Sequence, residues 1–185
     1  MASVILNGDT SGSVTISPPA VAGTQTVTLP AASGILQVSG NMPAFAAYAN
    51  ATQSVSNSTW TKVQINTKIF DTANCFDNTT NYRFTPNVAG YYQVNGVIRM
   101  GATTPTEYFM AIYKNGSAYT GGNDFLGTAA GGATQMVVTD LIYLNGSTDY
   151  IELYGYISAA SNQQFQWGTV TYATSKFSAA LVRGA

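Results

Sequence analysis

The chain has 185 residues, of which 45% are hydrophobic, 12% aromatic and only 8% charged, against roughly 25% charged in an average soluble domain. Eight acidic and seven basic side chains give a net charge of −1, so no basic field exists to recruit nucleic acid or an anionic membrane. Histidine is absent and Cys75 is the single cysteine, which removes histidine-based acid–base and metal chemistry and any intrachain disulfide. We expect no enzymatic activity, no metal, no cofactor and no nucleic-acid partner.

Residues 1–42 differ in composition from the rest, because they contain no aromatic side chain. Three short β-type segments, Val14–Ile16, Val27–Leu29 and Ile35–Val38, are separated by Gly and Pro, and none is long enough to bury a core. We expect an extended N-terminal arm that gains its order from sister chains or from another protein. The candidate attachment residues, which would add as strands to a foreign sheet, are Val14, Thr15, Ile16, Val27, Thr28 and Leu29.

The beginning of the chain does not resemble a secretory leader. Val4, Ile5 and Leu6 are followed by polar turn formers, whereas a signal peptide needs an apolar stretch of roughly 7 to 15 residues. No apolar run approaches the ~18 residues of a membrane span. We therefore expect synthesis in the cytoplasm and no membrane partner.

Residues 43–185 show strand after strand, with turn signals at intervals of about 8 to 12 residues, which is typical of a sandwich or barrel. Asn115-Gly116 predicts a tight hairpin, and Asn145-Gly146 predicts another turn. Nine or ten strands are expected in all. Those that the pattern places are Trp60–Asn66, Ile69–Phe76, Tyr82–Thr85, Tyr91–Met100, Tyr108–Tyr113, Met136–Leu144, Asp149–Ile157 and Lys176–Val182.

Alternation of side chains predicts which faces of three strands are covered. In Asp149–Ile157, the tyrosines at 150, 154 and 156 share one face with Glu152, and the aliphatic side chains occupy the other. Tyr108–Tyr113 and Met136–Leu144 are apolar with little alternation, so both are expected to be central strands covered on both faces.

The acidic residues and the cysteine are expected to have structural roles. Asp71 and Asp77 are too few for a calcium site, which takes six to eight oxygens, and are interpreted as turn caps. Nothing in the spacing of Glu107 and Glu152 supports a catalytic carboxylate pair, and Glu152 is expected at an edge or in a salt link. Cys75 is expected to be buried in an apolar strand as a small hydrophobe.

Four aromatic residues leave two interpretations open. They can pack in the core or at a trimer axis, or they can form a platform on which a host-surface sugar stacks. The residues concerned are Trp60, Tyr154, Tyr156 and Trp167.

One motif carries a resemblance to a known family. Residues 82–94 read Y-R-F-T-P-N-V-A-G-Y-Y-Q-V, with Phe84, Pro86, Gly90 and Tyr91 at its characteristic positions, and residues 175–182 close the chain with Phe177. Both stretches resemble the globular head of the complement first-component q and tumour necrosis factor superfamilies. In this interpretation Pro86 ends one strand, Gly90 permits a tight re-entry, and the aromatic side chains at 84 and 91 fill the interior.

The resemblance covers residues 43–185 and implies an all-β fold. The implied domain is a jelly-roll sandwich of about ten antiparallel strands that assembles as a homotrimer, preceded by the extended arm of residues 1–42. Composition independently favours an assembly, since abundant aromatic surface combined with scarce charge is what an obligate interface presents.

The arm carries a second, looser resemblance. Residues 8–13, 22–24 and 28–34 read G-D-T-S-G-S, A-G-T and T-L-P-A-A-S-G, which is similar to phrases in structural proteins of tailed bacteriophages. The hypothesis is therefore a non-enzymatic virion protein, a homotrimeric knob whose arms bind a capsid or tail protein, as capsid decoration or cement. The alternative is a short tail fibre or spike head that binds host-surface glycan. A third is a secreted complement-like ligand, which the missing leader and collagen-type stalk disfavour.

Overall fold

The computed structural model describes residues 3–17, 19–21, 23–24, 26, 31, 38, 40, 42–126, 132–167 and 174–185. Within these ranges the chain forms only strands, turns and irregular segments. Among the same residues there is no helix with the length and apolar character needed to cross a membrane. The chain divides into two compact units, Met1–Gly34 and Ile35–Ala185.

The first unit contains a β-hairpin. Strands β1 (Val4–Asn7) and β2 (Ser13–Ile16) pair antiparallel, and the turn between them is closed by the Gly8 N–H, which donates to the Gly12 carbonyl oxygen at 3.0 Å. The predicted strand Val14–Ile16 is confirmed, but its pairing with β1 was not predicted. The predicted strand Val27–Leu29 lies outside the described residues.

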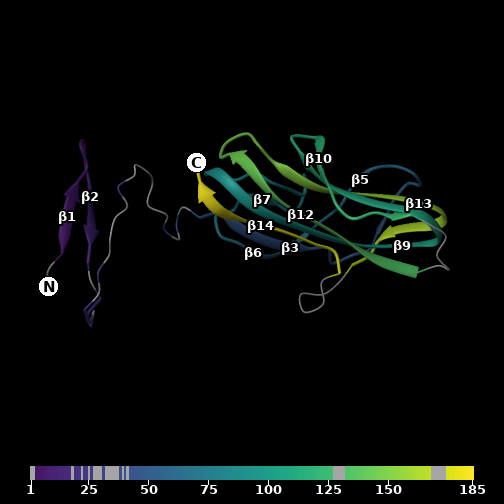
Figure 1. Ribbon diagram of the computed structural model, residues 1–185, viewed down its shortest axis with the longest axis horizontal. Coiled ribbons are helices and arrows are strands. Elements are labelled where there is room, and N and C mark those ends of the chain that lie inside the picture. Colours follow the sequence, from purple (N-terminus) through teal and green to yellow (C-terminus); the bar gives the residue numbers. More distant parts are fainter. Residues whose placement is uncertain are drawn as a thin grey trace. The chain divides into compact units, whose positions relative to one another are not determined.

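The second unit is a sandwich of two β-layers (Figure 1). In the first layer the strands follow the order β6-β3-β14-β9-β12, and in the second layer β13 pairs with β9 and with several short strands. The strands of the first layer are β6 (Thr67–Asp71), β3 (Ala44–Tyr48), β14 (Lys176–Gly184), β9 (Ala89–Lys114) and β12 (Gly132–Asn145). The second layer contains β13 (Ile151–Phe165), β4 (Gln53–Ser54), β5 (Thr61–Lys62), β7 (Phe76–Asp77), β8 (Arg83–Phe84), β10 (Ser117–Gly121) and β11 (Phe125–Leu126).

Strand β9 belongs to both layers. Its first half pairs with β12 and β14, and its second half pairs with β13, β10 and β11. Thr104, which has a φ of 49°, lies where the strand passes from one layer to the other. The prediction of two separate strands at 91–100 and 108–113 is therefore wrong, because a bend inside one strand replaces the expected turn.

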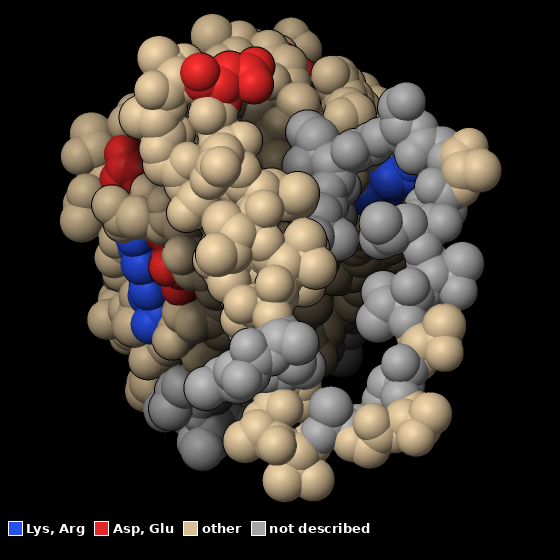
Figure 2. All heavy atoms as spheres, turned by 90° about the vertical axis from the view of Figure 1, so that its left-hand side faces the viewer, with Lys and Arg blue, Asp and Glu red and all other residues tan. Residues whose placement is uncertain are grey.

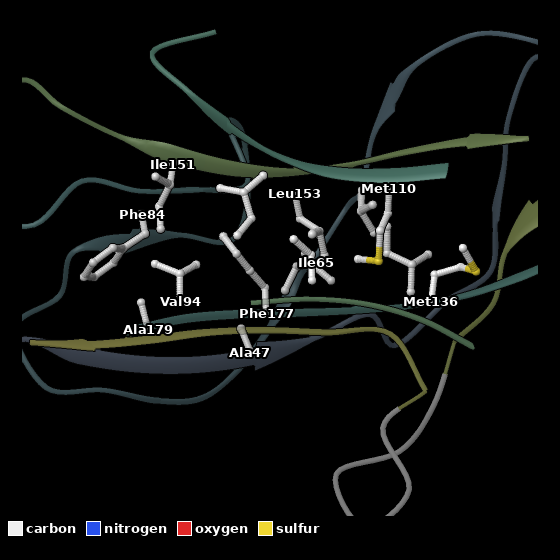
Figure 3. Packing of buried hydrophobic residues seen from close by; sticks show 14 of the residues in the cluster. Ala47, Ile65, Phe84, Val94, Met110, Met136, Ile151, Leu153, Phe177 and Ala179 are labelled. Atoms are coloured by element: carbon white, nitrogen blue, oxygen red, sulfur yellow. The ribbon is translucent and has the colours of Figure 1, made fainter. Parts of the chain in front are cut away.

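The core fills the space between the layers, and Figure 3 shows side chains of both layers pointing toward one another. Phe45 is its centre: its ring stacks on Phe76 at 4.4 Å and on Phe84 at 4.6 Å, and meets the edge of Phe177 at 5.4 Å between centroids. These rings come from β3, β7, β8 and β14, so four distant segments close one cluster. The interior position predicted for Phe84 is confirmed, and Phe177 is buried as well.

The family-like motif is confirmed at three of its four positions and wrong at one. Buried Pro86 follows the end of β8, and a Cβ atom at Gly90 would collide with the Arg183 carbonyl oxygen of β14. Tyr91, however, is 42% exposed, whereas Tyr92 is fully buried and donates its hydroxyl to the Val88 carbonyl oxygen at 2.7 Å. Because strand side chains alternate, a shift of one residue places the ring on the opposite face.

Three other strand predictions need correction. Only Thr61–Lys62 of the segment 60–66 is a strand, and the segment 69–76 is divided by a turn between β6 and β7. Cys75 lies in that turn, partly buried against the core rather than inside a strand. Met136–Leu144 alternates between exposed side chains and side chains that are buried or, at Asp140, partly buried, so the chain by itself covers one face of this strand and not two.

Two local predictions are confirmed. Asn115 and Gly116 both have positive φ, 53° and 79°, and form the tight turn between β9 and β10. In β13 the aliphatic side chains face the core, while Tyr154 and Tyr156 lie on the other face.

Aspartates cap the turns, as predicted for Asp71 and Asp77. Asp77 accepts the backbone N–H groups of Thr79 and Thr80, both at 3.0 Å, and these hydrogen bonds hold its pKa well below the usual range. Burial alone would raise the pKa of Asp71, but hydrogen bonds from Lys68 and from backbone N–H groups lower it overall. The pKa of Asp149 is lowered chiefly by the Asn115 side chain, at 2.8 Å.

These caps predict the pH dependence of stability. A carboxylate whose pKa is lower in the folded state stabilises the fold above its unfolded pKa, and that stability is lost as the pH falls. We expect the denaturant midpoint to be flat from about pH 5 to 8, where no side chain has its ordinary pKa, and to fall steadily below about pH 4. Urea titrations across the pH range measure this, with Asp77→Asn expected to flatten the acid limb; an equally steep limb in that variant would contradict it.

Candidate interaction surfaces

The outward side of the layer β6-β3-β14-β9-β12, here termed the first-layer face, is exposed and apolar. Val137 and Leu141 of β12 are 50% and 51% exposed. Tyr91 and Tyr143 are directly paired across β9 and β12, and their rings meet edge to face at 5.5 Å. A band of aromatic and aliphatic side chains therefore crosses the outside of two neighbouring strands.

The polar groups on this face are bonded to one another. The Gln93 side-chain amide donates to the Thr139 hydroxyl at 2.8 Å, and that hydroxyl donates to the Asn95 side-chain oxygen at 2.9 Å. Beside this chain lies a shallow hollow of about 270 Å³, lined by Phe70, Ala180 and neighbouring residues of β3, β9 and β14. The face thus combines apolar side chains with internally satisfied polar ones, which lowers the cost of removing it from water.

Charge is sparse on the surface as a whole. Figure 2 shows Lys and Arg, and Asp and Glu, as small separate groups on a mostly uncharged face. No group of three or more His, Cys, Asp or Glu side chains among the described residues is placed to hold a metal ion. The described surface therefore offers partners shape and apolar area rather than a strong field.

A second surface is a cluster of rings on the outward side of the second layer. The Trp60 ring lies 5.7 Å from Tyr156, 6.1 Å from Tyr113 and 6.5 Å from Phe109 between centroids. Tyr113 also stacks on Tyr154 at 3.8 Å. We call these five residues the aromatic cluster; it is solvent-facing, since Trp60 is 40% exposed and the others are half-buried.

The strand register explains how the aromatic cluster forms. Tyr156 pairs with Phe109 across β13 and β9, and Trp60 precedes β5, which pairs with β13 at Tyr154. Burial raises the pKa of Tyr113 and of Tyr154, so both phenols stay neutral in ordinary buffers and present hydroxyl groups beside ring faces.

Charged side chains border the aromatic cluster at one end. Lys62 Nζ lies 2.5 Å from Glu152 Oε1, and Glu152 is only 3% exposed, which confirms the salt link predicted for this glutamate. The same Lys62 lies 6.0 Å from the centre of the Tyr154 ring, and the Arg83 guanidinium lies 4.4 Å from the centre of Tyr150. Hydrogen-bond donors therefore lie next to the exposed rings.

Some residues that the sequence analysis grouped together lie far apart in the structure. Trp167 is 51% exposed but follows the far end of β13, away from the aromatic cluster. Glu107 and Glu152 pair with Ser158 and Tyr113 respectively, which spaces the two glutamates by six residues along β13, ~20 Å at 3.3 Å per residue. That distance is too long for the carboxylate pair of a glycosidase.

A polar hollow of about 480 Å³ lies beside β7 and is lined in part by Lys68, Cys75 and Arg83. Burial raises the pKa of the Cys75 thiol above its ordinary value, so the thiolate that would react is disfavoured. This hollow carries no arrangement of reactive groups.

Several surface residues were missed in the sequence. Phe109 and Tyr113 were assigned to a strand covered on both faces, and Leu141 and Tyr143 to another. The alternation in β12 could not reveal its outward face, because residues of both parities are apolar. The paired positions of β9 and β12 are visible only once the register is known.

Neither a known family model nor a curated protein sequence matches the chain. Solved structures do. The globular domain of zebrafish complement 1qA protein matches with a TM-score of 0.52 and 16% identity, over 77% of this chain and 98% of that one. Eiger TNF from S. frugiperda matches with a TM-score of 0.56 and 8% identity, over 78% and 93% of the two chains.

Murine APRIL gives a similar result, with a TM-score of 0.54, 8% identity, and coverage of 76% of this chain and 99% of that one. At these identities the likeness concerns the fold. The second unit of the chain is thus a jelly-roll sandwich like those of the C1q globular domain and the TNF family.

Proposed function

We propose that the chain is a non-enzymatic structural protein that works as a homotrimer, with the first-layer face of each subunit buried against its neighbours. The observation that supports this proposal is the pair of half-exposed side chains Val137 and Leu141 beside the Tyr91–Tyr143 ring contact. Half-exposed apolar side chains of this kind, set among amides and hydroxyls that bond to one another, on a chain with 8% charged residues, support a protein interface. Association would also cover the second face of Met136–Leu144, as the sequence led us to expect.

The trimer is proposed to be a knob fastened to a bacteriophage particle by residues 1–42, with a capsid or tail protein as partner and the virion as its location. The phage-like phrases of the arm support this assignment. The role proposed for the knob is decoration or cement on the head, with the β1–β2 hairpin as part of the attachment element. Three arms per knob would raise the effective concentration of each arm at the shell, and binding only to assembled capsomers would stabilise that shell.

The trimer is tested by placing a charge on the first-layer face. Leu141→Asp would bury an unpaired carboxylate in each subunit, at a cost of roughly 3–5 kcal/mol per subunit, so we expect mostly monomers at low micromolar concentration by analytical ultracentrifugation. Leu126→Asp is the matched control, since Leu126 is 66% exposed on the second layer, and it should stay trimeric. A wild-type chain that sediments as a stable monomer would overturn the proposal.

The arm is tested by deletion. Removing residues 1–40 should abolish attachment to particles and leave the trimer intact, because the sandwich carries the proposed trimer interface. Co-sedimentation of the truncated chain and of the full chain with particles that lack this protein measures attachment. Immunogold labelling of intact virions distinguishes the head from the tail as its location. Truncated trimers that still attach would show that the arm is not the anchor.

The aromatic cluster favours a second candidate function, a short tail fibre or spike head that binds host-surface glycan. Trp60 presents an exposed ring at the centre of a ring-lined surface, and sugar C–H groups pack on such ring faces while hydroxyls bond to neighbouring donors. The Lys62 ammonium, 6.0 Å from the centre of the Tyr154 ring, supplies a donor at the border. The cluster contains no aliphatic side chain, in contrast with the first-layer face.

A glycan array with matched tryptophan variants tests this candidate. If the cluster binds sugar, Trp60→Ala should weaken binding about tenfold or more. Trp167→Ala removes a tryptophan that is more exposed, 51% against 40%, but lies outside the cluster, and it should have no effect. Circular dichroism checks that both variants remain folded. An array with no signal for the wild-type trimer, or equal losses in both variants, would reject glycan binding at this surface.

A further inference from the structure

We infer that the β1–β2 hairpin is a second trimerisation element, in which three copies pack their apolar faces together around one axis. This inference rests on the proposed homotrimer and extends it to the arm. The partner of the hairpin's apolar face is therefore the same hairpin of the two sister chains.

The hairpin has one fully apolar face. Val4 lies opposite Ile16, and Leu6 lies opposite Val14, so these four side chains project from the same side of the two-stranded sheet. Each is between 55% and 64% exposed. The other side presents Ile5, Asn7, Ser13 and Thr15, and three of those four side chains are polar.

Such an element is not stable by itself. A lone two-stranded hairpin in water is at best marginal, and it needs further strands or a packed apolar face. Here both cross-strand pairs on the apolar face are aliphatic, and all four side chains remain exposed within the chain. The hairpin therefore requires a partner that covers Val4, Leu6, Val14 and Ile16 together.

The charge of the arm indicates what kind of partner this is. Asp9, in the turn, is the only charged residue among residues 1–42. A partner selected by charge has nothing to bind on the apolar face, and identical copies have no charge there to repel one another. The apolar face of one hairpin can therefore pack against the apolar faces of its sister copies without burying a charge.

Threefold packing satisfies the geometry. With three hairpins facing one axis, the pairs Val4–Ile16 and Leu6–Val14 form two layers, each with two aliphatic side chains from every subunit. The sandwich trimer tethers the three hairpins, so their association is intramolecular and favoured by a high effective concentration. The outward side chains and the open strand edges would then remain accessible to the particle protein.

Cysteine cross-linking in the full-length chain tests this arrangement. In a Cys75→Ala background, Leu6→Cys places a thiol on the apolar face and Ile5→Cys places one on the opposite face, one residue away. With a short bis-maleimide we expect cross-linked chains on denaturing gels for Leu6→Cys and several-fold fewer for Ile5→Cys. Val14→Cys and Thr15→Cys repeat the comparison on β2, in case one substitution disturbs the hairpin.

The outcomes separate this inference from the proposed trimer. Sedimentation shows whether each variant is trimeric. If a trimeric Leu6→Cys variant cross-links no more than Ile5→Cys, and Val14→Cys no more than Thr15→Cys, the hairpin bundle is overturned and the trimer is kept. A monomer without cross-links overturns both. A further outcome is that the cysteine variants are trimers without cross-links and that Leu6→Asp, tested separately, abolishes attachment to the particle. This result would overturn the bundle and identify the particle as the partner of this face.

Discussion

The structure depends on a constraint in β9 and β12. Apolar side chains occur on both faces of these paired strands, and the interior of one sandwich can cover only one of the two faces. The inner parity is buried with the Phe45 ring cluster between the layers. The outer parity leaves Val137, Leu141 and the Tyr91–Tyr143 pair in contact with solvent. In a chain with so few charges, such a face is best accounted for by association, and the proposed trimer follows from this.

Three exposed surfaces differ in chemistry, and the difference suggests two kinds of partner: sister copies of the chain for two of the surfaces, and a polar ligand for the third. The first-layer face mixes aliphatic and aromatic groups with satisfied amides, which suits another copy of the sandwich. The aromatic cluster around Trp60 is made of rings with hydroxyl and cationic neighbours, which suits a polar ligand with C–H faces. The β1–β2 hairpin is aliphatic on one side only, which suits its own sister copies.

Much of the second unit could be predicted from the sequence. The alternation in β13, the positive-φ turn at Asn115-Gly116, the interior ring of Phe84 and the capping roles of Asp71 and Asp77 each depend on neighbours close in sequence. Tyr91 and Tyr92 could not be distinguished in this way, because two adjacent aromatic residues fit either parity of a strand. The joining of two expected strands into β9 was also hidden, because Gly101 and Pro105 on either side of the bend at Thr104 are equally typical of a turn between separate strands.

The sequence by itself determined the all-β class, the family-like motif and the scarcity of charge and reactive side chains, because composition and local alternation are properties of the chain alone. Only the tertiary structure decided which parity faces the core, which rings gather around Trp60 and how β1 pairs with β2. Those outcomes depend on strand register, which joins residues far apart in sequence. A shift of one residue in that register moves every side chain of a strand to its opposite face.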